Sequence, residues 1–504
     1  MKRLSVFLFI VWCSGNVESQ DRYAANYYVD CSAQSNGDGS LQNPWNALAS
    51  VNNSTFSPGD SILFKRGTIA LGELWPKGSG NERAQIIIDS YGTGPKPIID
   101  AQGEENSAAI RLSNQEYWTI QNMEVINNAK TMGSRWGIYV YANDSLVKHK
   151  IHIKNNTVHN VYASSIRTPK GTEIPSFYSV GGIYVKVEEP GSMNDILVEG
   201  NQLTDIVGIG ICFWGESEMA GDGMNWDNLS PHVIIRGNSV LRTGADGILV
   251  LGTDNEFIEY NFVNGAGQLG KSEDIPGKAG TNGTDYIAGL WPTRHRGGIV
   301  QYNEVCNTRR FIGLGQSFDN DLYVTGTTIF QYNYSHDNEG GFFLDCCSPE
   351  ETNTGNIIRY NISQNDGRYD YMTLLKGKNL VYNNVFYSTD TIVIDKSSNN
   401  FFYNNIFWSI DGKWNNNTFD HNSYFGGLIA PDNDTSRIVK NPKFVNPGAG
   451  KTGIETLEGY KLQISSPCLS NGKIILNNGD KDFWGNPIPV TAAPNIGAHN
   501  RVDN

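Results

Sequence analysis

The stretch Val300-Gln-Tyr-Asn303-Glu-Val305 carries a phrase that recurs along most of this chain. The phrase consists of an apolar residue, two variable positions, an asparagine, one variable position and then usually a second apolar residue. Ten copies lie in phase, and their asparagines are Asn156, Asn201, Asn238, Asn261, Asn303, Asn333, Asn361, Asn384, Asn405 and Asn422. The shortest spacings between copies, 17 to 23 residues, give the length of one repeat, and longer spacings indicate inserted loops.

Each copy is usually followed by a second strand-like segment, such as Gly181–Val185, Asp246–Val250 or Gly340–Leu344. A strand, an asparagine turn, a second strand and a glycine turn in regular repetition are typical of a β-solenoid. Alternate apolar side chains then point inward, and the asparagines of successive coils stack about 4.8 Å apart as a ladder. An ordinary β-sandwich with asparagine-rich hairpins is the alternative, but ten copies in phase favour the solenoid.

Composition excludes several classes of protein. The 504 residues carry a net charge of −13, and only 18% of them are charged. A mean hydropathy of −0.39 argues against a polytopic membrane protein. An acidic chain without basic runs is also poorly suited to binding nucleic acid through its phosphates, so we expect no nucleic-acid partner.

The N-terminus predicts export. A basic pair at residues 2–3 precedes an apolar run over residues 4–13, which is too short to span a bilayer about 30 Å thick. We therefore expect residues 1–19 to be a signal peptide and the mature protein to be secreted, extracellular and without a membrane span. Six cysteines then remain, an even number that permits disulfides without defining their pairing. Sequons such as Asn143-Asp-Ser145 and Asn433-Asp-Thr435 predict a glycoprotein if the host glycosylates.

Both ends of the chain carry segments suited to closing a solenoid. The N-terminal part contains Asn36-Gly-Asp-Gly39 and Ser57-Pro-Gly-Asp-Ser-Ile-Leu-Phe-Lys-Arg-Gly67, and the tail contains Asp482-Phe-Trp-Gly485 and Asn495-Ile-Gly-Ala498. These phrases resemble the ends of secreted parallel β-helix glycoside hydrolases and polysaccharide lyases. The resemblance implies an all-β, single-stranded, right-handed parallel β-helix that acts on an extracellular polysaccharide.

The same reasoning divides the mature chain into three parts. We expect an N-terminal cap with the first coils over residues 20–110. The parallel β-helix coils with their inserted loops should then cover residues 111–430, and a C-terminal closing segment residues 431–504. We expect the protein to be a monomer.

Glycosidic bond cleavage requires a protonated carboxylic acid and a second carboxylate. Aligning Leu290, Leu314 and Leu344 as inward residues of successive coils places Asp345 outward. Asp319 follows the neighbouring strand, so we expect Asp319 and Asp345, on adjacent coils, to be the leading catalytic pair.

Other residues of the same region complete the expected site. Trp291 is expected to stack on a sugar ring, and Gly315 to leave room for that ring. The remaining candidates are Asp321, Asp285 and Glu339 as further catalytic carboxylates, and Arg294, Arg310, Lys376 and Trp214 as substrate-binding residues.

Two other classes of protein stay open. A polysaccharide lyase would abstract a proton beside a uronate carboxylate neutralised by Ca²⁺ or arginine, and Asp319 with Asp321 would then bind the Ca²⁺. A non-catalytic glycan-binding protein would use the same carboxylates only to cap turns. The hydrolase requires no cofactor and no metal.

Overall fold

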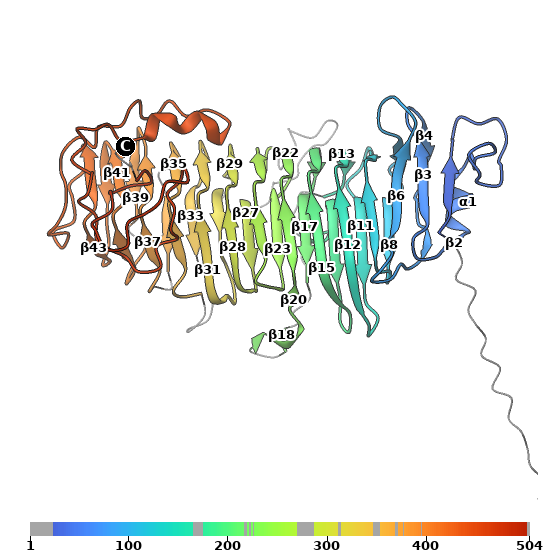
Figure 1. Cartoon of the computed structure of the whole chain (residues 1–504), viewed down its shortest axis with the longest axis horizontal. Helices are drawn as coiled ribbons and strands as arrows, with labels where there is room; N and C mark the ends of the chain where they lie inside the picture. The colour runs from blue at the N-terminus through green and yellow to red at the C-terminus, as the bar shows by residue number, and fades with distance from the viewer. Residues whose placement is uncertain are drawn as a thin grey trace, which may run out of the picture.

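The structure is a computed structural model that describes residues 24–164, 175–215, 219–220, 223–224, 226–269, 287–310, 314–345, 353–367, 371–375, 377–394 and 396–500. Its strands stack along one long axis, from the N-terminal strands at one end to the closing segment at the other (Figure 1). The strands of the three large sheets all pair in parallel, which confirms the expected parallel β-helix. The predicted signal peptide lies outside the described residues.

Each coil contributes a strand to up to three long sheets. The 16-stranded sheet contains β1 (Asn26–Val29), β3 (Ser61–Lys65), β6 (Ile86–Tyr91), β9 (Trp118–Gln121), β12 (Val147–Lys154), β15 (Ser192–Glu199), β20 (Ser230–Pro231), β21 (Val233–Arg236), β24 (Thr253–Asp254), β25 (Phe257–Glu259), β28 (Arg296–Gln301), β31 (Thr325–Gln331), β34 (Ile357–Arg359), β37 (Leu380–Tyr382), β40 (Phe401–Tyr403) and β43 (Thr418–Asp420). The 13-stranded sheet contains β4 (Ile69–Leu71), β7 (Ile98–Asp100), β10 (Glu124–Asn127), β13 (Thr157–Tyr162), β16 (Gln202–Val207), β22 (Ser239–Thr243), β26 (Phe262–Asn264), β29 (Glu304–Cys306), β32 (Tyr334–His336), β35 (Ile362–Gln364), β38 (Val385–Tyr387), β41 (Ile406–Ser409) and β44 (Ser423–Gly426). The nine-stranded sheet contains β8 (Ser107–Ser113), β11 (Arg135–Ala142), β14 (Gly181–Val187), β17 (Ile209–Trp214), β23 (Ile248–Leu251), β27 (Ala288–Thr293), β30 (Gln316–Asp319), β33 (Gly341–Asp345) and β36 (Met372–Leu374).

The remaining elements are short. Three two-stranded pairs join β2 (Thr55–Phe56) to β5 (Lys77–Gly78), β18 (Met219–Ala220) to β19 (Gly223–Met224), and β39 (Thr391–Val393) to β42 (Asp411–Lys413). The helices are α1 (Leu48–Asn52) and the 3₁₀ turns η1 (Phe177–Ser179), η2 (Trp226–Asn228) and η4 (Ile454–Tyr460).

The ten predicted asparagines form the expected ladder between the 16-stranded and 13-stranded sheets. Each is buried, and from Asn201 onward each side-chain oxygen accepts hydrogen bonds from the preceding asparagine, whereas that of Asn156 accepts from the backbone N of Met123. For example, Asn303 Oδ1 accepts from both the backbone N and the Nδ2 of Asn261 at 3.0 Å. The ladder ends where Asn422 donates to the buried carboxylate of Asp434 at 2.9 Å. Because every rung satisfies buried amides, the ladder fixes the register of the coils.

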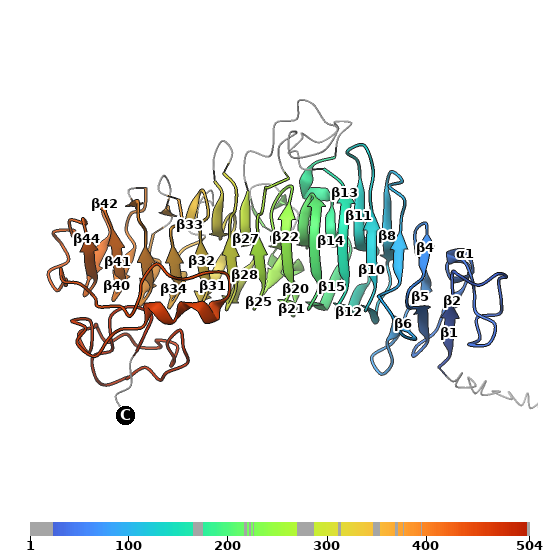
Figure 2. The ribbon, with the colours of Figure 1, turned by 90° about the horizontal axis from the view of Figure 1, so that it is seen from above.

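The core lies inside the three sheets and follows the alternation of the strands. Val240, Val263 and Val305 occupy the same position on successive coils of the 13-stranded sheet and are buried in one apolar cluster. The outer face of this sheet is covered near its C-terminal end by the closing segment, which includes η4 (Figures 1 and 2). There Leu457 and Tyr460 of η4 pack in a second apolar cluster with Tyr334 of β32.

Two further findings concern the described residues only. None of their helices is long and apolar enough to cross a membrane. The cysteines among them, Cys31, Cys212, Cys306 and Cys468, are free thiols. The disulfides that an even number of cysteines permits are therefore not formed by these four residues.

Candidate active site on the nine-stranded sheet

Two rows of side chains project from the outer face of the nine-stranded sheet. The strand pairing brings Leu249 beside Trp291, and the pairing of Leu290 with Phe318 places Asp319 next to Trp291 on the following coil. The second row, two residues further along each strand, joins Trp214, Leu251, Thr293 and Asp321. Successive members of a row are separated by the strand spacing of about 4.8 Å.

Asp319 and Asp321 thus point to the same side of one strand segment. Asn320, between them, points into the helix, where its Oδ1 meets Nε2 of the buried His295 at 2.9 Å. Thr293 Oγ1 donates to the backbone O of Asp321 at 2.7 Å, which ties this segment to the preceding coil. The backbone that carries both carboxyl groups is therefore fixed in two ways. It bonds to the preceding coil, and the inward-pointing Asn320 between the two aspartates anchors it to the interior.

The Asp319 carboxyl group is buried, with 2% of the residue exposed. Burial raises its pKa well above the ordinary range, and the charge of Asp321, a hydrogen bond with Asp321 and the charge of Asp246 raise it further. The backbone N–H of Asn320 opposes this rise. Asp319 is therefore a carboxylic acid that keeps its proton at a pH where an exposed aspartate has lost it.

Asp246, which the sequence analysis missed, lies on the same face. It lies two residues before β23, and its Oδ1 accepts a hydrogen bond from the backbone N of Ala288 at 2.8 Å. Burial raises the pKa of Asp246 to about 7, although the Ala288 N–H and the indole of Trp291 act in the opposite direction. The outer face thus carries three neighbouring carboxyl groups, two of which hold protons unusually strongly.

Several polar atoms on this face have no hydrogen-bond partner among the described residues. They include Oε1 of Gln316 and Oδ1 of Asp319. Each is buried, and a buried polar atom without a partner costs roughly 1–3 kcal/mol. Such atoms gathered on one face are typical of a site that a polar ligand completes.

The predicted partner of Asp319 does not belong to this face. Asp319 pairs in register with Leu344, so Asp345 is one residue further on and points into the helix. It is fully buried, and its two oxygens accept from Nδ2 of Asn353 at 3.2 Å and from Nδ2 of Asn379 at 2.9 Å. The prediction that Asp345 points outward is wrong because Leu344 is not the counterpart of Leu290: Leu290 pairs with Phe318, and Phe318 pairs with Phe343.

Leu314 lies in a turn before β30, where it has a φ of 44°. The following Gly315 has a φ of 94°, and a side chain there would come within 3 Å of Arg310. Glycine is therefore required by the turn, and its predicted role of making room for a sugar has no support in this geometry. Phe318, four residues after Leu314, is the true counterpart of Leu290.

The other predicted site residues fall into three groups. Trp291 is nearly buried in an apolar cluster on the outer face, and Trp214 lies on the same face with its ring 6.1 Å from that of Tyr178. Arg294 follows β27 directly, is partly buried, and its Nε has no partner among the described residues. Asp285 and Lys376 lie outside the described residues.

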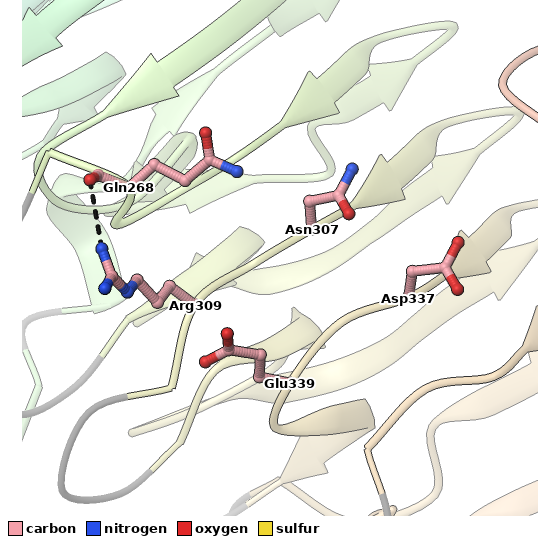
Figure 3. A pocket seen from close by; sticks show the side chains of 5 residues that line it. All are labelled: Gln268, Asn307, Arg309, Asp337 and Glu339. Atoms are coloured by element: carbon pink, nitrogen blue, oxygen red, sulfur yellow. Dashed lines mark hydrogen bonds between the residues drawn. The ribbon is translucent and has the colours of Figure 1, made fainter.

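Glu339 lines a different feature, an open pocket of about 390 Å³ where the 13-stranded sheet turns toward the nine-stranded sheet, and Arg310 lies beside it (Figure 3). Its lining residues come from three successive coils and are Gln268, Asn307, Arg309, Asp337 and Glu339. Glu339 accepts from the backbone N of Arg310 at 2.8 Å, and Asp337 holds Nδ1 of His336 at 2.8 Å. Both pocket carboxylates are exposed and hydrogen-bonded within the turn, which makes them weaker candidates for proton transfer than Asp319.

The pocket nevertheless adjoins the candidate site. Gly340 N donates to Gly315 O at 3.0 Å, so this edge of the pocket lies at the beginning of β30 and β33. Asp319 lies at the end of β30. The polar pocket and the carboxyl cluster therefore lie on the same group of coils.

Comparison with known proteins supports the fold and one class of activity. No family model matches the sequence. The chain is 25% identical to a lacto-N-biosidase of Bifidobacterium longum subsp. longum, over 94% of this chain but only 36% of that protein. The chain thus spans about a third of the length of this curated relative.

Solved structures show the same architecture. A GH136 lacto-N-biosidase from Eubacterium ramulus superposes with a TM-score of 0.58 at 23% identity, covering 82% of this chain and 66% of the other. XylC in complex with xylose superposes with a TM-score of 0.52 at 11% identity, covering 95% and 98% of the two chains. The fold is therefore that of the parallel β-helix carbohydrate-active proteins, as the resemblance of the chain ends implied.

Proposed function

We propose that the protein is a glycoside hydrolase in which Asp319 is the general acid and Asp321 the second carboxylate. The observation that carries this proposal is the buried Asp319 carboxyl group, which holds its proton strongly and shares a hydrogen bond with Asp321 on the outer face. Hydrolysis of a glycosidic bond requires this combination of a proton donor and a carboxylate. The lacto-N-biosidase relatives support the same class of reaction.

In the proposed reaction, Asp319 transfers its proton to the glycosidic oxygen as the bond to the anomeric carbon breaks. Two carboxyl groups that share a hydrogen bond are closer than the 6.5–9.5 Å or so of an inverting pair, which must accommodate a water molecule. We therefore propose a retaining reaction, in which Asp321 attacks the anomeric carbon. Water then hydrolyses the glycosyl ester while Asp319 accepts its proton, which restores both groups.

Two other side chains serve substrate binding in this proposal. The ring of Trp291 is adjacent to Asp319 in the same row and offers an apolar surface to a sugar. Gln316 Oε1 supplies an acceptor that lacks a partner among the described residues, and the Trp291 indole N–H supplies a donor beside Asp246. Since Asp319 and Asp321 are only 2% and 7% exposed, the sugar must displace the side chains that cover them.

The relatives, named lacto-N-biosidases, suggest the substrate to try first, a lacto-N-bioside. We also propose that the protein acts outside the cell, on the basis of the apolar run near its N-terminus. The test is release of the disaccharide from an aryl lacto-N-bioside, followed by a panel of plant, algal and animal glycans. Nuclear magnetic resonance of the first product formed should show the anomer with retained configuration.

On a natural oligosaccharide, the variants Asp319→Asn and Asp321→Asn should each lose at least about a hundredfold in kcat/KM while keeping the circular dichroism spectrum of the parent. Asp337→Asn, a carboxylate in the neighbouring pocket, is the matched control and should retain most of the activity. An unsaturated product whose formation stops with a chelator would instead identify a Ca²⁺-dependent lyase. No activity on the whole panel would favour a glycan-binding protein.

A further inference from the structure

A second cluster of reactive side chains lies on a different sheet. The side chains of Glu304 and Cys306 project from the outer face of β29, and that of His336 projects from the outer face of the neighbouring β32. The pairing of Cys306 with His336 places these two residues side by side, with Glu304 two residues earlier on β29. All three are buried, and one ligand atom from each lies within 4.8 Å of the other two.

The distances between these atoms are close to those around a tetrahedral zinc ion. Metal–ligand bonds of about 2.0–2.3 Å place neighbouring ligand atoms roughly 3.3–3.8 Å apart. His336 Nε2 is already 3.2 Å from Glu304 Oε1. The thiol of Cys306 needs to approach by only about 1 Å, which a side-chain rotation provides.

The imidazole is oriented as in metal sites. Its Nδ1 lies 2.8 Å from Oδ2 of Asp337, so Nε2 faces Glu304 and Cys306. A carboxylate on the far nitrogen of a histidine ligand fixes the ring and makes the other nitrogen a stronger donor to a metal. The ring of Tyr334 stacks on that of His336 at 4.4 Å and holds it from the side.

The closing segment seals the cluster. The backbone N–H of Gly453, just before η4, donates to both oxygens of Glu304 at 3.0 and 2.9 Å. Figure 1 shows η4 lying along this edge of the solenoid, above the strands of the 13-stranded sheet. An ion bound by Glu304 would therefore also fasten the C-terminal segment to the sheet.

We propose that Glu304, Cys306 and His336 bind one Zn²⁺ ion with a structural role. A thiolate, an imidazole and a carboxylate form a ligand set suited to zinc, whereas Ca²⁺ and Mg²⁺ prefer oxygen ligands alone. The competing arrangement is metal-free and holds an imidazolium between two carboxylates. Burial lowers the pKa of His336, but its hydrogen bonds with Asp337, Cys306 and Glu304 raise that pKa to about 11.

The test begins with the complete protein, purified without a metal-affinity tag, stripped with a chelator and dialysed against Zn²⁺ and then against metal-free buffer. Mass spectrometry of the elements should find one zinc per chain. Loading with Co²⁺ should produce the near-ultraviolet charge-transfer band of a cobalt thiolate, which added Zn²⁺ should abolish. Zn²⁺ should also raise the Tm of the stripped protein.

Variants then locate the ion. Cys306→Ala and His336→Ala should lose the zinc and its effect on Tm, whereas Cys212→Ala, which removes a buried thiol from the nine-stranded sheet, should retain both. A wild-type protein that keeps no zinc, or a cobalt complex without the thiolate band, would overturn the proposal. The zinc content and the cobalt spectrum of the wild type test the proposal even if a variant misfolds.

Discussion

Asp319 and Asp345 lie on neighbouring strands of the nine-stranded sheet but extend from its opposite faces. Asp319 pairs with Leu344 and points outward, whereas Asp345, the next residue, points inward. Inside the helix, Asp345 joins a second ladder of amides, in which Asn379 donates to Asp345 and accepts from Asn356. Two aspartates that look equivalent in the sequence therefore have different roles, one in the candidate site and one in the support of the coils.

Asp345 should matter for stability. Replacing it with alanine removes one of the two acceptors of each Nδ2 group, since Asn353 also donates to Asn320 O and Asn379 to Asn400 Oδ1, and each buried N–H left unpaired costs about 1–3 kcal/mol. We expect the free energy of unfolding, measured with urea, to fall by roughly 2–5 kcal/mol. Asp432→Ala removes an exposed carboxylate and should leave it within about 0.5 kcal/mol. Equal effects of both variants would show that Asp345 has no structural role.

The second ladder of amides, which continues from Asn379 through Asn400 to Asn417, offers a matched pair of adjacent residues. The buried Asn417 accepts from the backbone N and the Nδ2 of Asn400 at 3.0 and 3.2 Å, whereas its neighbour Asn416 is exposed. Asn417→Ala should lower the free energy of unfolding by roughly 2–4 kcal/mol, because two buried donors lose their acceptor. Asn416→Ala should change it by less than about 0.5 kcal/mol. Equal free energies of unfolding for the two variants would show that these hydrogen bonds do not stabilise the protein.

Asp246 should make the stability depend on pH. Its pKa is raised by burial from 3.8 to about 7, so the folded chain keeps a proton that the unfolded chain has lost between those values. The stability contribution of Asp246 therefore falls as the pH rises from 4 to 7. Asp246→Asn removes the titrating group and should stabilise the protein at pH 8 by up to about 4 kcal/mol, with little effect at pH 4.

Urea unfolding of the wild type and of Asp246→Asn at the two pH values checks this prediction. Asp432→Asn, which alters an exposed carboxylate, serves as the control for the change in net charge. A gain of the same size at both pH values would show that the ionised form of Asp246 carries no burial penalty.

Trp291 should contribute to binding more than to the chemical step. Its ring neighbours Asp319, and covering apolar ring surface with a sugar contributes roughly 25 cal/mol per Å² of the area buried. Trp291→Phe should accordingly raise KM about 3–10-fold with a smaller change in kcat. Trp408→Phe alters a tryptophan of the 13-stranded sheet and should leave both constants unchanged. An unchanged KM for Trp291→Phe would remove this ring from the substrate site.

The sequence was sufficient to predict the solenoid because its ladder repeats in phase. Each asparagine must satisfy the amides of the coil before it, so the constraint acts on one residue type at one position of every coil. The expected residues of the ladder, from Asn156 to Asn422, are all present in it. Inserted loops change the spacing along the chain without disturbing this local requirement.

The candidate site was harder to predict because the face of the sheet on which a side chain lies depends on the exact number of residues in the preceding turn. One additional residue reverses the face of every side chain that follows it, and the turns before these strands differ in length. Leu314 resembles Leu290 in its sequence surroundings but lies in a turn at positive φ, whereas Phe318 takes the inward position. Asp246 could have been found from the repeat itself. The phrase Asp246–Val250 is a second strand-like segment equivalent to Gly340–Leu344, and Asp246 stands at its start.

The central claim is that Asp319 donates the proton to the departing sugar oxygen. The most direct test compares Asp319→Asn with the wild type on two substrates, an aryl glycoside with a nitrophenol leaving group and a natural oligosaccharide. The account predicts a loss in kcat/KM of about 10²–10⁴-fold on the oligosaccharide, whose leaving group needs the proton, and a much smaller loss on the nitrophenyl substrate. Equal losses on both substrates, or full activity on the oligosaccharide, would contradict it.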